Sequence, residues 1–218
     1  MKLTAPGRDC PLCSRLAAFR EEWRTREPHW HNAPVPTFGG LDARLLIVGL
    51  APGLRGANRT GRPFTGDYAG DLLYQTLIDF GFASGTYAAR PDDGLSLRGA
   101  VITNAVRCVP PANKPEGSEI RACRPFLSAT IEAVHELRAI LALGRIAHDS
   151  VVAALELKRS AVPFSHGASH AVRPGVTLFD SYHCSRYNTN TGVLTEAMFR
   201  AVFEQIRKAV DQAAAAVR

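Results

Sequence analysis

The chain has 218 residues, of which 46% are hydrophobic, so it can bury a core and is too apolar to be disordered. It carries 26 Lys and Arg against 20 Asp and Glu, a formal net charge of +6. Such a surface attracts polyanions, which makes nucleic acid the first partner to consider. Because only four of the basic residues are Lys, however, the Arg-rich and Ala-rich composition could also reflect the genome. Charge alone leaves the partner open.

The sequence contains no secretory or membrane signal. The start, MKLTAPGRDC, has no apolar region, and the longest apolar stretch, 41–54, is interrupted by charged residues, Pro and Gly. We therefore expect a cytoplasmic protein that does not bind membranes. In that reducing compartment, the five cysteines should be thiols or metal ligands and not disulfides.

Short apolar runs alternate with segments that have helical apolar spacing. The expected strands are residues 44–50, 100–106, 139–143 and 176–179. The expected helices are residues 71–80, 118–137, 145–157 and 195–217. This alternation predicts a parallel sheet covered on both faces, an α/β three-layer sandwich. No repeat or long linker divides the chain, so we expect one domain over 1–218, with the Gly-, Asp- and Pro-rich residues 86–98 as an exposed excursion.

The first strand is followed by a glycine-rich, arginine-rich segment. In open parallel sheets, ligands bind beyond the carboxyl ends of the strands. The segment begins GLAPG and contains Arg55, Arg59 and Arg62 before the first acid, Asp67. It matches neither GxxxxGK[ST] nor GxGxxG, so no nucleotide cofactor is expected. An ordinary surface loop is the alternative, but Phe64 within it favours a stacking role.

Two further strand ends carry polar side chains. Asn104 ends the second strand, where its amide either bonds a neighbouring loop or reads the edge of a base. His183 follows the fourth strand and precedes a polar stretch, 184–192. The remaining histidines have no convincing ligand set and are expected to be surface or structural residues: His29, His31, His135, His148, His166 and His170.

Four of the five cysteines form two groups. Cys10 and Cys13 make a C-x2-C pair, and Cys108 and Cys123 lie far downstream. Four thiolates suit either tetrahedral zinc or a 4Fe–4S cluster, and the spacing does not choose between them. Either metal would attach the N-terminal segment to the loop after the second strand. Cys184 adjoins His183, but adjacent side chains of an extended chain point to opposite faces, which disfavours a Cys–His nucleophile.

Together these motifs resemble the uracil-DNA glycosylase superfamily, specifically its family 5, the b-type enzymes with an iron–sulfur cluster. The resemblance covers residues 8–205. It rests on the four cysteines and on GLAPG, NRTGRPFTGD, TNAVRCVPPANKP and YHCSRYNTNTG. Family 4 would have GEAPG where this chain has Leu50, so Leu50 favours family 5.

The resemblance implies a four-stranded parallel sheet and a structural 4Fe–4S cluster held by Cys10, Cys13, Cys108 and Cys123. Phe64 would stack on a flipped base, Asn104 would bond its polar edge, and His183 would lie over its O2. Asp67 would be the acidic participant. Backbone donors from Gly49, Leu50 and Ala51 would help His183 to stabilise the departing base.

The proposed activity also requires residues that bind DNA. The expected phosphate and groove contacts are Arg55, Arg59, Arg62, Ser185, Arg186 and Asn190, with Arg107 in the same group of loop arginines. The chain departs from the family at His183-Cys184-Ser185, where HPS is usual. Cysteine relaxes a loop that proline would stiffen, which predicts a weaker or shifted substrate preference.

The expected activity is hydrolysis of the N-glycosidic bond of deoxyuridine in DNA, leaving an abasic site, by a monomer. Family 5 has a broad substrate range, so hypoxanthine, xanthine and an etheno-adduct of cytosine are further candidates. Two alternatives remain: a non-catalytic DNA-binding module with a structural metal cluster, and a redox sensor built on the cluster and Cys184.

Overall fold

The computed structural model describes residues 5–215, with side chains described to residue 212. Its centre is a six-stranded sheet in the order β1-β5-β2-β6-β8-β7. The four predicted strands are present and mutually parallel: β2 (Leu45–Gly49), β5 (Ala100–Asn104), β6 (Ala139–Leu143) and β8 (Val176–Ser181).

The expected number of strands, four, is wrong because two antiparallel edge strands complete the sheet. β1 (Phe38–Gly39) pairs with β5, and β7 (Ser169–Arg173) pairs with β8. β1 has two residues, and β7, with the sequence SHAVR, is mostly exposed and polar. Neither strand produces the apolar run that identifies a buried strand.

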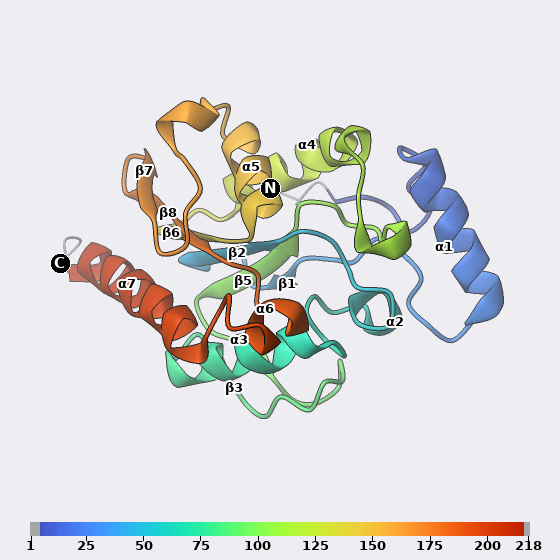
Figure 1. Ribbon diagram of the computed structural model, residues 1–218, viewed down its shortest axis with the longest axis horizontal. Helices are drawn as coiled ribbons and strands as arrows, with labels where there is room; N and C mark the ends of the chain where they lie inside the picture. Colours follow the sequence, from blue (N-terminus) through green and yellow to red (C-terminus); the bar gives the residue numbers. More distant parts are fainter. Residues whose placement is uncertain (1–4, 216–218) are drawn as a thin grey trace.

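Helices cover both faces of the sheet, which confirms the three-layer α/β sandwich (Figure 1). α3 (Tyr68–Asp79) and α7 (Glu196–Ala215) lie on one face, and α4 (Gly117–Ala133) and α5 (Arg145–Ala154) lie on the other. Successive residues of β2 serve opposite cores: Leu45 packs on the α3/α7 side and Leu46 on the α4/α5 side. This alternation follows from the pleat of a strand that is buried on both faces.

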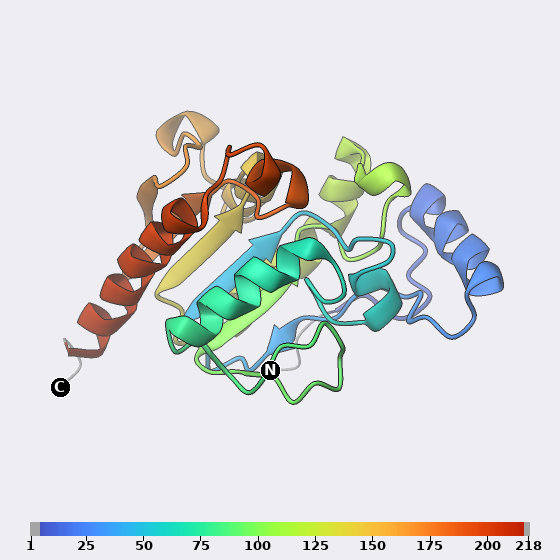
Figure 2. The ribbon, with the colours of Figure 1, turned by 60° about the horizontal axis from the view of Figure 1, so that its bottom comes forward.

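The chain also contains helices that apolar spacing did not predict. α1 (Ser14–Arg26) buries only Leu16 and Arg20, so it has no apolar stripe to recognise. α2 (Ala57–Thr60) and α6 (Arg186–Asn190) lie beyond β2 and β8, and single 3₁₀ turns occupy Pro111–Asn113 and Arg159–Ala161. Figure 2 shows α1, α2 and α6 at the same end of the molecule, beyond the tips of the parallel strands. The last residues of the expected helix 195–217 lie outside the described residues.

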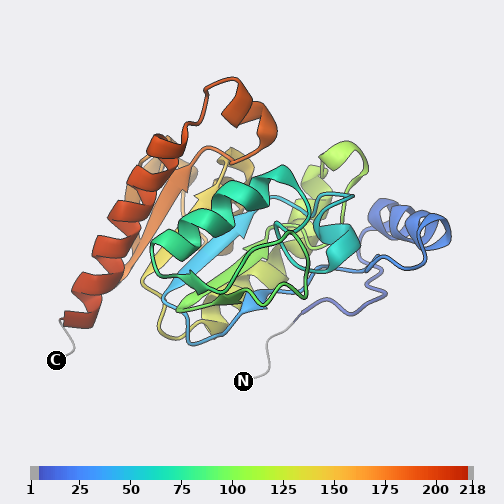
Figure 3. The ribbon, with the colours of Figure 1, turned by 90° about the horizontal axis from the view of Figure 1, so that it is seen from below.

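Residues 86–98 are only partly an exposed excursion. They lead into β4 (Ser96–Leu97), which pairs with β3 (Ala83–Ser84), and Figure 3 shows the segment passing close to α3 and α2. The Tyr87 ring packs on Tyr74 of α3, with ring centroids 4.6 Å apart, and the Asp93 side chain is fully buried. The composition of a loop does not show which of its side chains, such as Tyr87 and Asp93 here, are buried against the rest of the protein. Within residues 5–215, no helix combines the length and the apolar character that crossing a membrane requires.

Candidate active site

A cavity opens at the carboxyl ends of the parallel strands. It measures about 980 Å³ including its mouth. Its lining brings together predicted residues from the segments that follow β2, β5 and β8, namely Leu50, Ala51, Phe64, Asp67, Asn104, His183, Ser185 and Arg186. Three strand ends that are distant in the sequence therefore meet at one site, as the rule for open parallel sheets predicts.

Gly49 allows the floor of the cavity to close. It pairs with Asn104 in the register of β2 and β5. A Cβ at position 49 would collide with the Asn104 amide oxygen and lie 2.6 Å from Cζ of Phe64. Only glycine therefore lets these two side chains approach each other above the strand. Among the described residues, the Asn104 amide has no side-chain hydrogen-bond partner although Asn104 is 3% exposed, which leaves its donor and acceptor for a ligand.

Phe64 is held in a backbone conformation that a bulky residue rarely adopts. Its φ is +52°, in the left-handed region. Two hydroxyls support the turn: Tyr74 donates to the Pro63 carbonyl (2.6 Å) and Tyr87 donates to the Phe64 carbonyl (3.1 Å). The Phe64 carbonyl also lies where a Cβ of Gly70 would sit. Such strain, roughly 1–3 kcal/mol, persists where the surroundings fix the residue for a function.

Arg62 contributes to this support, and its predicted contact with DNA is wrong. Its guanidinium pairs in a bidentate manner with Asp93, at 2.8 and 2.7 Å, and its Nε donates to Thr65 Oγ1 at 2.7 Å. The guanidinium carbon lies 5.3–5.8 Å from the ring centroids of Phe38, Tyr74 and Tyr87. Arg62 is 5% exposed, so phosphate cannot reach a cation that is already paired and covered.

Asp67 is the only carboxylate among the described residues that line this cavity. It occupies the N-cap position of α3. Burial raises the pKa of Asp67, while the backbone amides of Gly70 and Ala69 work in the opposite direction. Its Oδ1 is buried and has no hydrogen-bond partner within the described part of the chain. An acceptor left free in this way can orient a water molecule or face a developing positive charge.

His183 also lines the cavity, next to Phe64. Its ring centroid lies 6.0 Å from that of Phe64, at an interplanar angle of 30°. Burial lowers the pKa of His183 to about 4, so the imidazole is neutral at physiological pH. The His183 carbonyl accepts a hydrogen bond from Asn188 Nδ2 at 2.8 Å, which ties the loop to α6.

Cys184, the departure from the family pattern, is a buried packing residue. It is 0% exposed, and its thiol donates to the Ala69 carbonyl at 3.4 Å. Burial raises the pKa of Cys184 to about 12. A buried thiol of this kind is inert, which argues against Cys184 as a nucleophile or a redox group.

The other predicted DNA contacts divide into exposed and buried residues. Arg55, Arg59, Arg186 and Asn190 are exposed, and Ser185 caps α6 by accepting the Asn188 N–H. The guanidinium of Arg186 lies 5.2 Å from the ring centroid of Tyr68. Arg59 lines a separate shallow hollow of about 970 Å³ with Arg8 and Arg90.

Arg107 does not belong with the exposed arginines. It is 1% exposed and donates to Thr130 Oγ1 at 2.9 Å and to the Val35 carbonyl at 3.3 Å. Its placement among the loop arginines that contact phosphate is therefore wrong. A strand end in the sequence does not indicate whether the next side chain turns inward.

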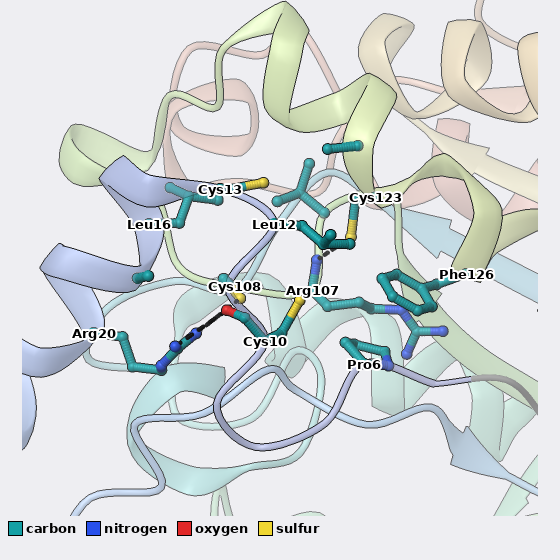
Figure 4. Close-up of a pocket in the computed structure, with 13 residues that line it drawn as sticks. Pro6, Cys10, Leu12, Cys13, Leu16, Arg20, Arg107, Cys108, Cys123 and Phe126 are labelled. Atoms are coloured by element: carbon teal, nitrogen blue, oxygen red, sulfur yellow. Dashed lines mark hydrogen bonds between the residues drawn. The ribbon is translucent and has the colours of Figure 1, made fainter.

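The four cysteines of the predicted metal set surround one small cavity. It measures about 320 Å³ and is lined by Cys10, Cys13, Cys108 and Cys123, all free thiols. Figure 4 shows the first two on the N-terminal segment, facing the latter two on the body of the protein. Among the described residues, no three His, Cys, Asp or Glu side chains converge as ligands of a metal ion.

The charges around this cavity fit an anionic group. Arg20, 4% exposed, donates to Cys108 Sγ at 3.8 Å, and the Arg107 N–H donates to Cys123 Sγ at 3.3 Å. Burial lowers the pKa of the Arg107 guanidinium to about 10, and its described hydrogen-bond partners, the Val35 carbonyl and Thr130 Oγ1, are both uncharged. Burial also raises the pKa of the Cys108 thiol to about 12, so ligation must displace protons. A cluster ligated by four thiolates would supply the missing negative charge.

Among the residues that line the active-site cavity but were not predicted, two carry polar side chains, Tyr68 and Asn113. Tyr68 follows Asp67 directly and forms the mouth together with Arg186. Asn113 ends the 3₁₀ turn after β5 and has a φ of +56°. Asn113 lies in the motif TNAVRCVPPANKP, and Tyr68 follows directly after NRTGRPFTGD, but the sequence does not show which side chains of a loop face inward.

Known proteins place the chain in one family. Residues 36–207 match the family model for the uracil DNA glycosylase superfamily. The type-5 uracil-DNA glycosylase of Thermus thermophilus is 46% identical over 205 residues, 91% of this chain and 93% of the relative. The type-5 enzyme of Pyrobaculum aerophilum is 40% identical over 191 residues, 86% of this chain and 83% of the relative.

A type-4 relative is more distant. The type-4 uracil-DNA glycosylase of Sulfurisphaera tokodaii is 31% identical over 176 residues, 78% of this chain and 73% of the relative. This difference agrees with the choice of family 5 over family 4 that Leu50 indicates. The chain belongs to the uracil DNA glycosylase superfamily, in its type-5 family.

Proposed function

We propose that the protein is a DNA-repair glycosylase that hydrolyses the N-glycosidic bond of uracil in DNA and leaves an abasic site. The observation that carries the proposal is the cavity beyond β2, β5 and β8, which combines an aromatic wall, an unpaired amide and an isolated carboxylate. Membership of the family disfavours the non-catalytic DNA-binding module and the redox sensor.

The base would bind between the walls of the cavity. A base inside a duplex is inaccessible, so the target nucleotide must leave the stack, which costs a few kcal/mol. Phe64 offers a face for stacking, and the Asn104 amide can pair with the donor and acceptor edge of uracil. The Asn104 amide is held against Phe64 above Gly49, and this fixed position supports recognition of uracil by hydrogen bonds to its edge.

Bond breaking leaves negative charge on the base. The neutral imidazole of His183 donates a hydrogen bond towards O2, with backbone N–H groups of residues 49–51 as further donors. A donor that is already neutral does not have to lose charge or reorganise while the base departs. His183 therefore stabilises the leaving group by hydrogen bonding and not as an imidazolium acid.

The sugar becomes cationic as the base departs, and Asp67 is the group that faces this change. Its carboxylate either stabilises the cation or orients the attacking water, because its buried Oδ1 has no other partner among the described side chains and backbone groups. Leu50 supplies no second acid in the loop after β2. Less specific activation of the leaving group fits a substrate range that includes hypoxanthine, xanthine or etheno-cytosine.

Phosphate contacts come from the exposed cations. Arg186 lines the cavity, and Arg55 lies in the sequence between the lining residues Gly53 and Ala57. Arg59 extends the basic surface towards Arg8 and Arg90. Ser185 and Asn190 belong to the α6 segment that enters the groove. In this proposal the protein acts on DNA as a cytoplasmic monomer with one domain over 1–218.

The cysteine cavity would hold a 4Fe–4S cluster through Cys10, Cys13, Cys108 and Cys123. Bound there, the cluster supplies a rigid covalent link and negative charge, and it takes no part in base release. The buried cations of Arg20 and Arg107 support this assignment. The N-terminal segment and α1 would thereby be fixed to the loop after β5, close to the active site.

The proposal is tested by incubating the protein with a duplex that contains one uracil and cleaving abasic sites with alkali. We expect a single cleaved product with the wild type, and none with the matching thymine duplex. His183→Ala should reduce the single-turnover rate about 10²- to 10³-fold because a donor to the departing base is lost. An unchanged rate in the variant would remove His183 from the mechanism, and no product from the wild type would refute the proposed activity.

The cluster assignment makes its own prediction. Cys123→Ser should yield a protein that has lost the brown colour and the iron of the wild type and unfolds at a lower temperature, because metal binding and folding are linked. Cys184→Ser, at the remaining cysteine, should retain both iron and colour. Metal analysis that finds zinc and no iron in the wild type would replace the cluster with the alternative that cysteine spacing left open.

A further inference from the structure

Three histidines that have no part in the proposed chemistry converge on the last residues of β8. Residues 180–182 deliver His183 to the active site, and each is fixed by a different partner. Asp180 pairs with His148 of α5, the Ser181 carbonyl accepts the Gly144 N–H at 2.8 Å, and the Tyr182 N–H donates to His166. His170 lies 3.8 Å from the second oxygen of Asp180.

The surroundings of His148 define its protonation state. Its Nδ1 lies 2.7 Å from Asp180 Oδ1, and its Nε2 lies 2.8 Å from the Val162 carbonyl oxygen. Both partners are acceptors, so both ring nitrogens must carry a proton for both hydrogen bonds to form. His148 is 1% exposed and the Asp180 side chain 0%, so water cannot substitute for a missing proton. With Asp180 ionised, this geometry requires an imidazolium beside a buried carboxylate.

The environment of His166 requires the opposite state. The Tyr182 backbone N–H donates to His166 Nδ1 at 3.1 Å, which is possible only if that nitrogen carries no proton. The His166 ring also stacks on Tyr182, with centroids 5.0 Å apart at an interplanar angle of 25°. The end of β8 is thus held by one charged histidine and one neutral histidine.

This end of β8 is close to His183. Gly144, the N-cap of α5, has its ideal Cβ position 3.5 Å from Cβ of His183. The His148 N–H closes the first turn of α5 on the Gly144 carbonyl at 3.0 Å. A movement of His148 away from Asp180 would therefore shift both the start of α5 and the strand that carries His183.

We propose that His148, as an imidazolium paired with Asp180, is a positioning residue that fixes the strand end carrying His183 and makes its placement depend on a proton. The proposal rests on the proposed function for its catalytic consequence, but not for the charge state of His148. Among variants of one active site, a displacement of about 1 Å can cost about 10²-fold in rate.

The sign of the pH dependence follows from the groups around His148. Burial lowers the pKa of His148, but the hydrogen bond and charge of Asp180, with the Val162 carbonyl and Asp149, raise it above its usual value. Phe164 packs edge-on against the His148 ring, and His170 faces that ring from β7. The guanidinium carbon of Arg145 lies 5.1 Å from the ring centroid of Phe164. Because the folded pKa is raised, the stabilisation is complete below the unfolded pKa of about 6.5 and is lost as the pH rises through the folded value.

His166 limits the arrangement on the acid side. Burial lowers the pKa of His166, against the effect of the Met198 backbone of α7. Protonation of Nδ1 would remove the acceptor for the Tyr182 N–H. On the acid side of the pH–rate profile, His183 and Asp67 titrate as well as His166. The loss of rate on the alkaline side is therefore the part of the profile that reports His148 alone.

Asp180→Asn separates charge from packing. With Asn at position 180, a neutral His148 can accept from the new amide at Nδ1 and still donate to Val162 at Nε2, so both hydrogen bonds survive without the proton. The variant should fold, keep its activity within about 3-fold of the wild type at pH 7, and lose the alkaline limb. His148→Gln cannot bridge both acceptors and should lower the single-turnover rate about 10- to 100-fold at unchanged DNA affinity.

The experiment is a ¹⁵N NMR titration of the histidine side chains, combined with single-turnover rates and thermal melting from pH 6 to pH 10. We expect the wild type to show His148 doubly protonated at pH 7, and to show loss of rate, melting temperature and the native His183 shift together as His148 deprotonates. Asp180→Asn should abolish this coupled change. His135→Gln, at an exposed histidine, is the matched control and should behave as wild type.

A neutral His148 at pH 7, or an alkaline limb that persists unchanged in Asp180→Asn, would overturn the proposal. If no protein in the series releases uracil, the proposed function fails. The NMR and melting results still decide whether His148 is charged and whether its titration moves His183.

Discussion

Asp67→Asn is expected to lower the single-turnover rate of uracil release by about 10²- to 10⁴-fold, with DNA affinity unchanged. Asparagine keeps the size of the side chain and an acceptor for the amides of α3. It removes the charge that faces the sugar cation or orients water. Asp71→Asn, at an exposed acid one turn along the same helix, is the control and should retain full activity.

The pH dependence of Asp67 provides an independent check. Burial raises the pKa of this carboxyl, and the ionised form is the active one, so the rate should fall on acidification at a higher pH than for an exposed aspartate. The same burial makes the ionised group a cost to folding at neutral pH, because the folded state holds the proton more tightly than the unfolded state. Asp67→Asn should therefore melt no lower than the wild type. A rate equal to that of wild type would remove Asp67 from the mechanism.

Arg62→Met is expected to destabilise the protein by about 3–5 kcal/mol, because it leaves the buried Asp93 carboxylate without its cationic partner and with only the backbone N–H groups of Ala88 and Leu95. The pair lies in a fully covered environment, with side-chain exposures of 6% and 0%. Denaturant unfolding measures the loss. In the double variant Arg62→Met/Asp93→Asn, no buried charge remains unpaired, so the double variant should be more stable than the single one.

Arg55→Ala is the contrasting variant to Arg62→Met. Arg55 is exposed, so its removal should leave stability unchanged and weaken DNA binding, lowering the slope of log K against log salt by about 0.9 if it contacts one phosphate. Arg62→Met should leave that slope unchanged while a folded population remains. An equal loss of slope in both variants would return Arg62 to the DNA-binding surface.

The sequence was most informative about residues in regular strands. The four parallel strands are recognisable by the apolar runs that burial on both faces requires: β2, β5, β6 and β8. Their parallel arrangement implies that Asn104 and His183 meet at one edge of the sheet. The short β1 and the polar β7 have no such run. α1 was missed because it packs through Leu16 and Arg20 and not through an apolar stripe.

The sequence was least informative about arginines. Arg55 and Arg62 share one glycine-rich segment, yet one is exposed and the other buried, because Asp93 lies 31 residues further along and only the fold brings it close. The same reason explains Arg107, whose partners Thr130 and Val35 belong to α4 and to the segment before β1. Net charge counts the cations, but tertiary contacts decide which of them are free to meet a partner.

The cysteine cavity imposes an order on the biosynthesis of the protein. Cys10 and Cys13 are translated before Cys108 and Cys123, which flank the loop before α4 and its first turns. At a translation rate of about 5–20 residues per second, the second pair of cysteines is synthesised on the order of ten seconds after the first. The Arg15–Glu119 pair, 104 residues apart, likewise cannot form earlier. The N-terminal segment must therefore remain unattached during synthesis of the first half of the sheet, and its docking with α1 is a late event in folding.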